Sequence, residues 1–161
     1  MPADIEFKAI GLDELIKRAA ALNGHMGPIV REFLTKSVQH VEKDAKRFAP
    51  VDTGRLRASI THKVSSTHIP DWASAGTNLI YAKPMEYGTK PGHFPPWGKK
   101  NPGLELWAKR HGISNGFLVA RAISRQGLRP RAYMSKAWEE TEGIVDDNLE
   151  QAKQKIESMW K

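Results

Sequence analysis

The sequence contains no cysteine, and this absence excludes several kinds of protein. Without thiols the chain can form no disulfide framework, no thiolate metal site and no cysteine nucleophile. The chain also has no apolar run that approaches the length of a membrane span, and its acidic first six residues lack the apolar core of a signal peptide. We therefore expect a soluble protein that no signal sequence exports and that contacts no membrane.

Acidic residues are scarce in the middle of the chain. The whole sequence carries 25 lysine and arginine residues against 18 aspartate and glutamate residues, a net charge of +7. Residues 51–131 hold thirteen basic side chains against four acidic ones, whereas residues 132–161 hold four against seven. Such asymmetry indicates either nucleic-acid binding or oppositely charged faces that pair between subunits. A solvated basic surface without a partner is the simplest alternative.

Sequence patterns of catalytic and metal sites are missing as well. The chain has no glycine-rich phosphate loop and no serine nucleophile elbow. Its histidines lack the spacing of metal ligands; they are His25, His40, His62, His68, His93 and His111. We therefore expect no enzymatic activity, no bound metal and no cofactor.

One tripeptide, Asp52-Thr53-Gly54, does match the catalytic sequence of aspartic proteases, in which two carboxylates share a proton. A single copy would work only in a symmetric dimer of a nearly all-β fold, whereas a long helical pattern runs into this tripeptide. Arg55 also replaces the small residue expected after the glycine. Glu86 is interpreted as a partly buried structural acid, because no partner at suitable spacing supports a general-base role.

Apolar residues spaced three and four apart predict the long helices. These helices cover residues 12–22, the stretch from about Pro28 to Phe48, and the chain from Met134 onward. A single kinked helix is the alternative to the first two, because the apolar stripe keeps its phase across the break. The last helix is acidic opposite its apolar stripe, and this stripe would dock either on the chain's own sheet or on the next subunit.

Looser alternation of apolar and polar residues predicts three short strands, near residues 5–9, 59–67 and 72–81. A chain of 161 residues is long enough for one domain with a real core. The prediction is an α+β fold over residues 1–161, in which a small antiparallel sheet packs against a long helix. A helical insertion and a C-terminal amphipathic helix complete it.

Residues 90–127 are expected to form the insertion. Seven prolines and glycines between residues 89 and 103 predict an irregular loop, and its Phe94 and Trp97 would tack it to the surface or to a neighbour. Helices are predicted at 104–111 and 115–126. In the second helix Leu118, Val119, Ala122 and Ile123 are expected to point inward, and Arg121 and Arg125 outward.

Residues 49–60 are expected to turn the chain from the long helix into the sheet. Pro50 cannot continue the helical ladder, so the helix should end at Ala49. Asp52 and Thr53 can accept hydrogen bonds from nearby backbone N–H groups, and Gly54 can adopt a positive φ. A strand-like pattern should follow, with Leu56 and Ile60 buried and with Arg55 and Arg57 pointing away.

This turn, Ala-Pro-Val-Asp-Thr-Gly-Arg-Leu-Arg-Ala-Ser-Ile, closely resembles a signature of the small neck or tail-completion proteins of tailed phages. Two further stretches resemble motifs of the same family: Tyr81-Ala82 with Glu86-Tyr87-Gly88-Thr89, and the run from Arg129 to Met134 that precedes the last helix. The matching positions form one set of structural motif residues. They are Pro50, Asp52, Thr53, Gly54, Leu56, Tyr81, Glu86, Gly88, Arg129 and Pro130.

The resemblance implies a structural virion protein at the phage head–tail junction, acting in tail completion or head–tail joining through ring assembly. It implies contacts with other copies of the chain, with the head-side connector and with tail-side tube or terminator proteins, besides non-specific contact with DNA. The expected location is the neck or tail of the virion, and the host cytoplasm during assembly.

Aromatic residues interleaved with lysine and arginine leave a second function open, that of a basic nucleic-acid-binding protein. Aromatic side chains serve equally as interface anchors, and no recognised nucleic-acid module occurs, so the interface is preferred. The candidate interface residues are Phe94, Trp97, Arg121, Arg125, Glu139 and Glu140.

Overall fold

A long central helix, α2 (Met26–Phe48), organises the larger part of the molecule. The computed structural model describes residues 3–7, 26–100 and 102–159, without the side chains of residues 3–7 and Lys100. The α+β prediction is confirmed. The helix predicted over residues 12–22, and with it the alternative of one kinked helix, lies outside the described residues.

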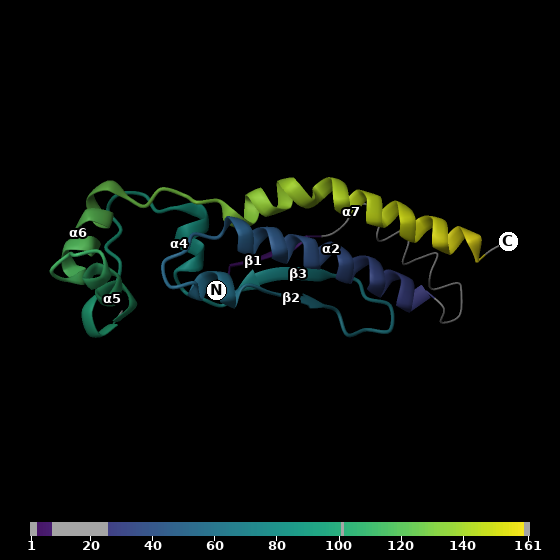
Figure 1. Cartoon of the computed structure of the whole chain (residues 1–161), viewed down its shortest axis with the longest axis horizontal. Helices are drawn as coiled ribbons and strands as arrows, with labels where there is room; N and C mark the ends of the chain where they lie inside the picture. The colour runs from purple at the N-terminus through teal and green to yellow at the C-terminus, as the bar shows by residue number, and fades with distance from the viewer. Residues whose placement is uncertain (1–2, 8–25, 101, 160–161) are drawn as a thin grey trace. The chain divides into compact units, whose positions relative to one another are not determined.

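Helix α2 has apolar side chains on more than one side, so it can pack against two layers at once. Its position between the sheet and the C-terminal helix is visible in Figure 1. Pro28 lies in the first turn, where its missing N–H has no helical partner to lose. The buried apolar residues of α2 are Met26, Val30, Phe33, Leu34, Val38, Val41 and Ala45.

Three antiparallel strands form the sheet in the order β1-β3-β2. They are β1 (Ala3–Phe7), β2 (Thr61–Val64) and β3 (Ala73–Thr77), and residue 75 of β3 is paired with residue 5 on one side and residue 62 on the other. All three strands were predicted, although β1 begins two residues earlier than expected and β2 and β3 are shorter than expected. The central strand consists of small residues, and its alanines are buried beneath α2.

The C-terminal helix, α7 (Tyr133–Ser158), packs along α2 of its own chain. The two docking alternatives, the chain's own sheet and the next subunit, were therefore both wrong. The buried apolar residues of α7 run from Met134 to Ile156, whereas Met159, which the same spacing of three and four would place in the stripe, is exposed. Polar contacts between α2 and α7 supplement the apolar ones. Thr141 Oγ1 donates to Asp44 Oδ2 at 3.2 Å, and Asn148 Nδ2 donates to Ser37 Oγ at 3.3 Å. Lys155 Nζ pairs with Glu32 at 2.9 Å, and Arg47 lies 3.6 Å from Glu140.

The corner between α2 and the sheet differs from the prediction. Arg55–Ser59 is a short helix, α3, and the strand begins only at Thr61. One helical turn places residues four apart on the same side, which buries both Leu56 and Ile60. The spacing of Leu56 and Ile60, four residues apart, thus reflects a helical turn and not the strand that was predicted.

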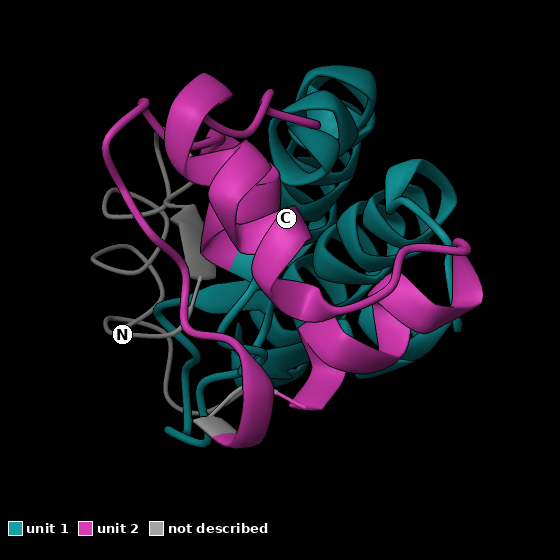
Figure 2. Ribbon diagram, turned by 90° about the vertical axis from the view of Figure 1, so that its left-hand side faces the viewer, with its two compact units in different colours: residues 1–82, 132–161 teal, residues 83–131 magenta. Residues whose placement is uncertain are grey.

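Residues 83–131 form a second compact unit, unit 2, while residues 1–82 and 132–161 form unit 1. Figure 2 distinguishes the two units by colour. Unit 2 contains most of α4 (Ala82–Tyr87), a 3-10 turn η1 (Gly98–Lys100), α5 (Pro102–Arg110) and α6 (Gly116–Gln126). The predicted insertion at 90–127 lies within it, and both of its predicted helices are present.

Candidate functional site

The turn that carries the longest sequence motif lies on the surface of unit 1. Asp52 and Thr53 are exposed, and Thr53 Oγ1 accepts a long hydrogen bond of 3.5 Å from the Arg55 N–H. Gly54 has φ +77°, and a Cβ added there would meet nothing within 4 Å. Pro50 is half-buried and Leu56 is buried. The motif therefore combines a buried anchor with an exposed turn.

The second motif begins beside this turn. Burial raises the pKa of the Tyr81 hydroxyl; the Arg55 guanidinium opposes that shift, and the Asp52 carboxylate adds to it. Tyr81 is still partly exposed, and its neighbour Ile80 is 95% exposed. Val51, in the turn, is exposed too. We call Val51, Asp52, Arg55, Ile80 and Tyr81 the corner patch.

The remaining motif residues close the base of unit 2. Thr89 and Leu128 exchange two backbone hydrogen bonds of 2.9 and 3.0 Å. Gly88 has φ +71°, and a Cβ there would lie 2.3 Å from the Leu128 carbonyl oxygen and 2.9 Å from Pro130. Gly88 is thus required both by its conformation and by close approach of the returning chain.

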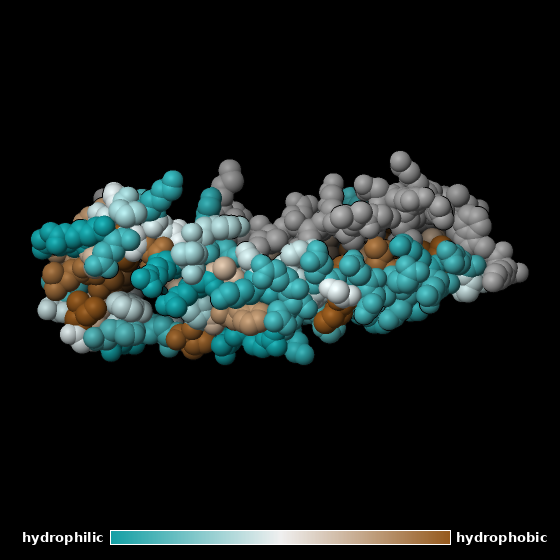
Figure 3. All heavy atoms as spheres, turned by 90° about the horizontal axis from the view of Figure 1, so that it is seen from above, coloured by the Kyte–Doolittle hydropathy of each residue, from teal (hydrophilic) through white to brown (hydrophobic). Residues whose placement is uncertain are grey.

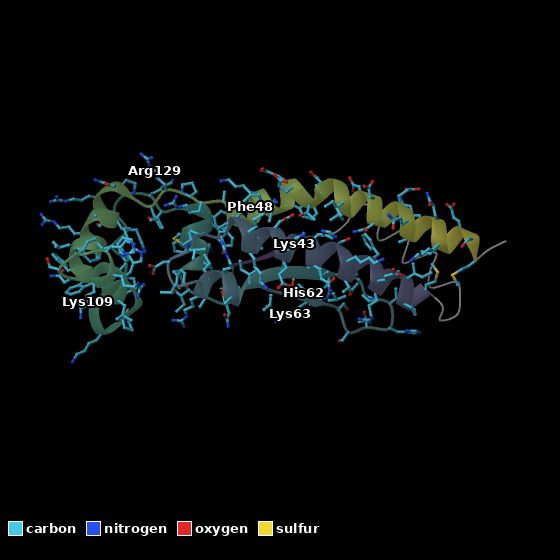
Figure 4. The ribbon with its side chains drawn as sticks, viewed as in Figure 1. Lys43, Phe48, His62, Lys63, Lys109 and Arg129 are labelled. Carbon is cyan, nitrogen blue, oxygen red and sulfur yellow. The ribbon has the colours of Figure 1, made fainter. Side chains whose placement is uncertain are left out.

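The third motif returns to α4 at this base. The Arg131 N–H donates to the Met85 carbonyl oxygen at 2.8 Å, and the next residue along α4, Glu86, is 2% exposed. Arg129 lies exposed near the base, where Figure 4 labels it. The second and third motifs, some forty residues apart in sequence, therefore meet in space.

Unit 2 exposes three aromatic rings, Phe94, Trp97 and Phe117, of which Phe117 lies against the other two. We call them the aromatic face. The Phe117 ring centroid lies 6.0 Å from that of Phe94 and 5.2 Å from that of Trp97, the latter edge-on. Phe94 and Trp97 are each 44% exposed and Phe117 is 38% exposed. Figure 3 shows apolar surface among hydrophilic side chains on this unit. Phe94 and Trp97 were predicted from the sequence, whereas Phe117 was not.

The inward side of α6 was predicted only in part. Val119 and Ile123 are half-buried, but Leu118 and Ala122 are exposed. The buried residues of α6 are Gly116 and Ala120. A Cβ at Gly116 would lie 3.2 Å from the Glu105 backbone nitrogen, so the small residues let α5 and α6 approach closely. The Phe117 side is thereby turned outward, and Arg121 and Arg125 are exposed as predicted.

Charge divides between the units more sharply than along the sequence. Unit 2 has ten lysine and arginine residues and two acidic ones, Glu86 and Glu105, whereas unit 1 has fifteen basic and sixteen acidic residues. The exposed side of α7 carries much of the acidic charge of unit 1, including Glu139 and Glu140. Arg47 lies 3.6 Å from Glu140.

No group of three or more His, Cys, Asp or Glu side chains suited to a metal ion occurs within the described residues. Among the helices of the described part, none has the length and apolarity to cross a membrane.

The structure thus defines an α+β protein with an exposed motif turn, an exposed aromatic face and a strong division of charge. Residues 13–88 match the HK97-gp10-like family, described as "Bacteriophage HK97-gp10, putative tail-component". This match covers a little under half of the chain and confirms, over these residues, the resemblance to a tailed-phage family. The matched stretch includes α2, the corner patch, β2, β3 and Gly88.

The family description indicates a phage tail component and hence a location in the virion. No curated protein and no solved structure gave a significant match.

Proposed function

We propose that this protein acts at the junction between phage head and tail, in tail completion or head–tail joining, by assembling into a ring. The observation that carries the proposal is the family match over residues 13–88, the same residues that build the corner patch. Several residues of the matched motifs are exposed, including Asp52, Thr53 and Tyr81. Exposed motif residues favour a role in contacts over a role in the core alone.

The proposed mechanism is steric and interfacial. The sheet, α2 and α7 share one core, so unit 1 can serve as a rigid body that holds the corner patch at a fixed position. Exposed aromatic and arginine side chains are the types that dominate protein interfaces. In this proposal they join copies of the chain to each other, to the head-side connector and to tail-side tube or terminator proteins.

The experiment that tests this role uses a phage that encodes the chain. Loss of the gene should leave filled heads and separate tails in electron micrographs, and expression of the intact chain should restore joined particles. Ile80→Ser with Tyr81→Ser should restore them poorly, whereas Lys63→Ser, an exposed change on β2, should restore them fully. Normal infectious particles in the absence of the gene would refute the proposal.

The charge of unit 2 favours nucleic-acid binding as a second candidate function. Ten basic against two acidic residues within 49 residues would attract a phosphate backbone. We expect only weak, non-specific contact with DNA. A gel-shift assay with random duplex DNA across a salt series tests this, since tight binding by the isolated protein that falls steeply with salt would favour the second function.

A further inference from the structure

The structure assigns a partner to the aromatic face: we infer that it docks on the exposed acidic side of α7 in a second copy of the chain. This inference rests on the proposed function, because it supplies the contact from which a ring would be built. It joins two different surfaces, so each copy would offer one surface to each neighbour.

The aromatic face is followed along α6 by two arginines. Residues four apart lie on the same side of a helix, so Phe117, Arg121 and Arg125 form one exposed strip. Phe94 and Trp97 widen its apolar end. Aromatic rings beside arginines form the combination most enriched among residues that dominate binding energy. Such a strip is complementary to an acidic surface that has space for an aromatic side chain.

The exposed side of α7 has that character. Gly143 lies in the interior of the helix, where glycine is less favourable than alanine, and a Cβ there would meet nothing within 4 Å. No contact of the described chain therefore requires glycine at this position. Its neighbours one turn away are all carboxylates; they are Glu139, Glu140, Asp146 and Asp147. We call Gly143 and these four residues the α7 notch.

The carboxylates of the α7 notch are poorly compensated within their own chain. Arg47 lies 3.6 Å from Glu140, while Glu139, Asp146 and Asp147 make no ion pair within the described residues. Like charges crowded on one helix repel each other, so a cationic partner relieves that repulsion. Unit 2, with ten basic and two acidic residues, supplies the complementary charge. A second copy is therefore the occupant that the charges favour.

The lack of native cysteine permits a direct test by cross-linking of the full-length chain. One variant carries Leu118→Cys, beside Phe117, and another carries Ile144→Cys, beside Gly143; both positions are exposed and outside the strip and the notch. A mixture of the two, treated with a short bis-maleimide, should yield cross-linked heterodimer at about ten times the level of a control mixture. The control pairs Leu118→Cys with Lys63→Cys on β2, a strand on the far side of α2 from α7 (Figure 4).

Charge reversal makes the test specific. Arg121→Glu with Arg125→Glu in the Leu118→Cys chain should reduce the yield about tenfold, because carboxylates would then face carboxylates. Adding Glu139→Lys with Asp146→Lys to the Ile144→Cys chain should restore it. All four positions are exposed, so both variants should fold, which circular dichroism verifies.

Gly143→Ala provides an independent measurement with effects of opposite sign. Alanine should raise the unfolding midpoint by about 2 to 4 °C, because it favours the helix more than glycine does. The added methyl group in the α7 notch should at the same time lower the yield of cross-linked heterodimer about fivefold or more. Heterodimer yield no higher than the control, or yield unaffected by charge reversal, would overturn the inference. If the cross-link does not form but deletion of the gene still abolishes head–tail joining, the contact is refuted and the proposed function stands. If the cross-link forms but phage particles assemble normally without the gene, the contact stands and the proposed function is refuted.

Discussion

Glycines 54 and 88 show how one residue type performs two tasks. Both have positive φ, but a Cβ at Gly54 would meet nothing within 4 Å, while one at Gly88 would lie 2.3 Å from the Leu128 carbonyl oxygen. At Gly54 only the backbone conformation disfavours a side chain. At Gly88 the returning chain disfavours it as well.

Alanine substitution should separate these two tasks. Gly54→Ala should lower the free energy of unfolding by about 1 to 2 kcal/mol, the cost of a left-handed conformation. Gly88→Ala should disrupt the base of unit 2 and cost more, about 3 kcal/mol, because strain and clash add. Urea unfolding of the two variants beside the unaltered chain measures both. Equal losses would mean that the close approach at Gly88 is absent.

Glu32 predicts a pH dependence for the packing of α7 on α2. Hydrogen bonds from Lys36, on α2, and Lys155, on α7, lower the pKa of the Glu32 carboxyl from 4.5 to about 2. A lowered folded-state pKa means that the stabilisation is complete above pH 4.5 and is lost as the pH falls toward 2. The unfolding midpoint of Glu32→Gln should thus lie below that of the unaltered chain at neutral pH and meet it near pH 2. A difference that stays constant with pH would contradict this.

A second carboxylate on α2 ties it to the sheet. Burial alone would raise the pKa of the Glu42 carboxyl, but the Lys46 ammonium and the His62 ring, on β2, together outweigh it and lower the pKa. Figure 4 labels His62 on β2. Polar contacts therefore reinforce both sides of α2.

At the scale of elements, the regular helices were predictable and the short or closely packed ones were not. Periodic apolar residues over more than twenty positions identified α2 and α7. The five residues of α3 span too little sequence for periodicity to distinguish a turn of helix from a strand. The pattern of apolar residues did not identify the inward side of α6, because the residues buried there, Gly116 and Ala120, are small rather than strongly apolar. Their small size lets α6 pack closely against α5.

Local sequence patterns also identified only part of the candidate site. Phe94 and Trp97 stood out in a loop rich in proline, whereas Phe117 stood in a helix whose orientation depends on its neighbour. The meeting of the second and third motifs depends on the closing of unit 2 at Thr89 and Leu128, which no local pattern encodes.

The packing of α7 on α2 should contribute strongly to the stability of unit 1. Leu149 is buried in this contact, so Leu149→Ala should leave a cavity and lower the free energy of unfolding by about 2 to 5 kcal/mol. Ile144→Ala, on the exposed side of the same helix, should cost less than about 1 kcal/mol. Denaturant unfolding of the two variants tests the orientation of α7, and similar losses would contradict it.

At the scale of the whole molecule, most of unit 2 lies between two residues, Thr89 and Leu128, that are hydrogen-bonded to each other. Thr89 and Leu128 face each other as a hydrogen-bonded antiparallel pair, which a two-residue Asn-Gly turn can join. A chain with residues 90–127 replaced by Asn-Gly should keep the helical circular dichroism and cooperative unfolding of unit 1. It should fail to restore joined particles. Loss of cooperative unfolding would show that unit 1 depends on unit 2.

Electron cryomicroscopy of the virion neck is the most direct test of the proposed ring at the head–tail junction. We expect a closed ring of density in which each copy fits the sheet, α2 and α7 of unit 1. We also expect unit 2 of each copy to lie against α7 of the next. Absence of the chain from the junction, or density for it elsewhere in the particle with no ring, would contradict this proposal.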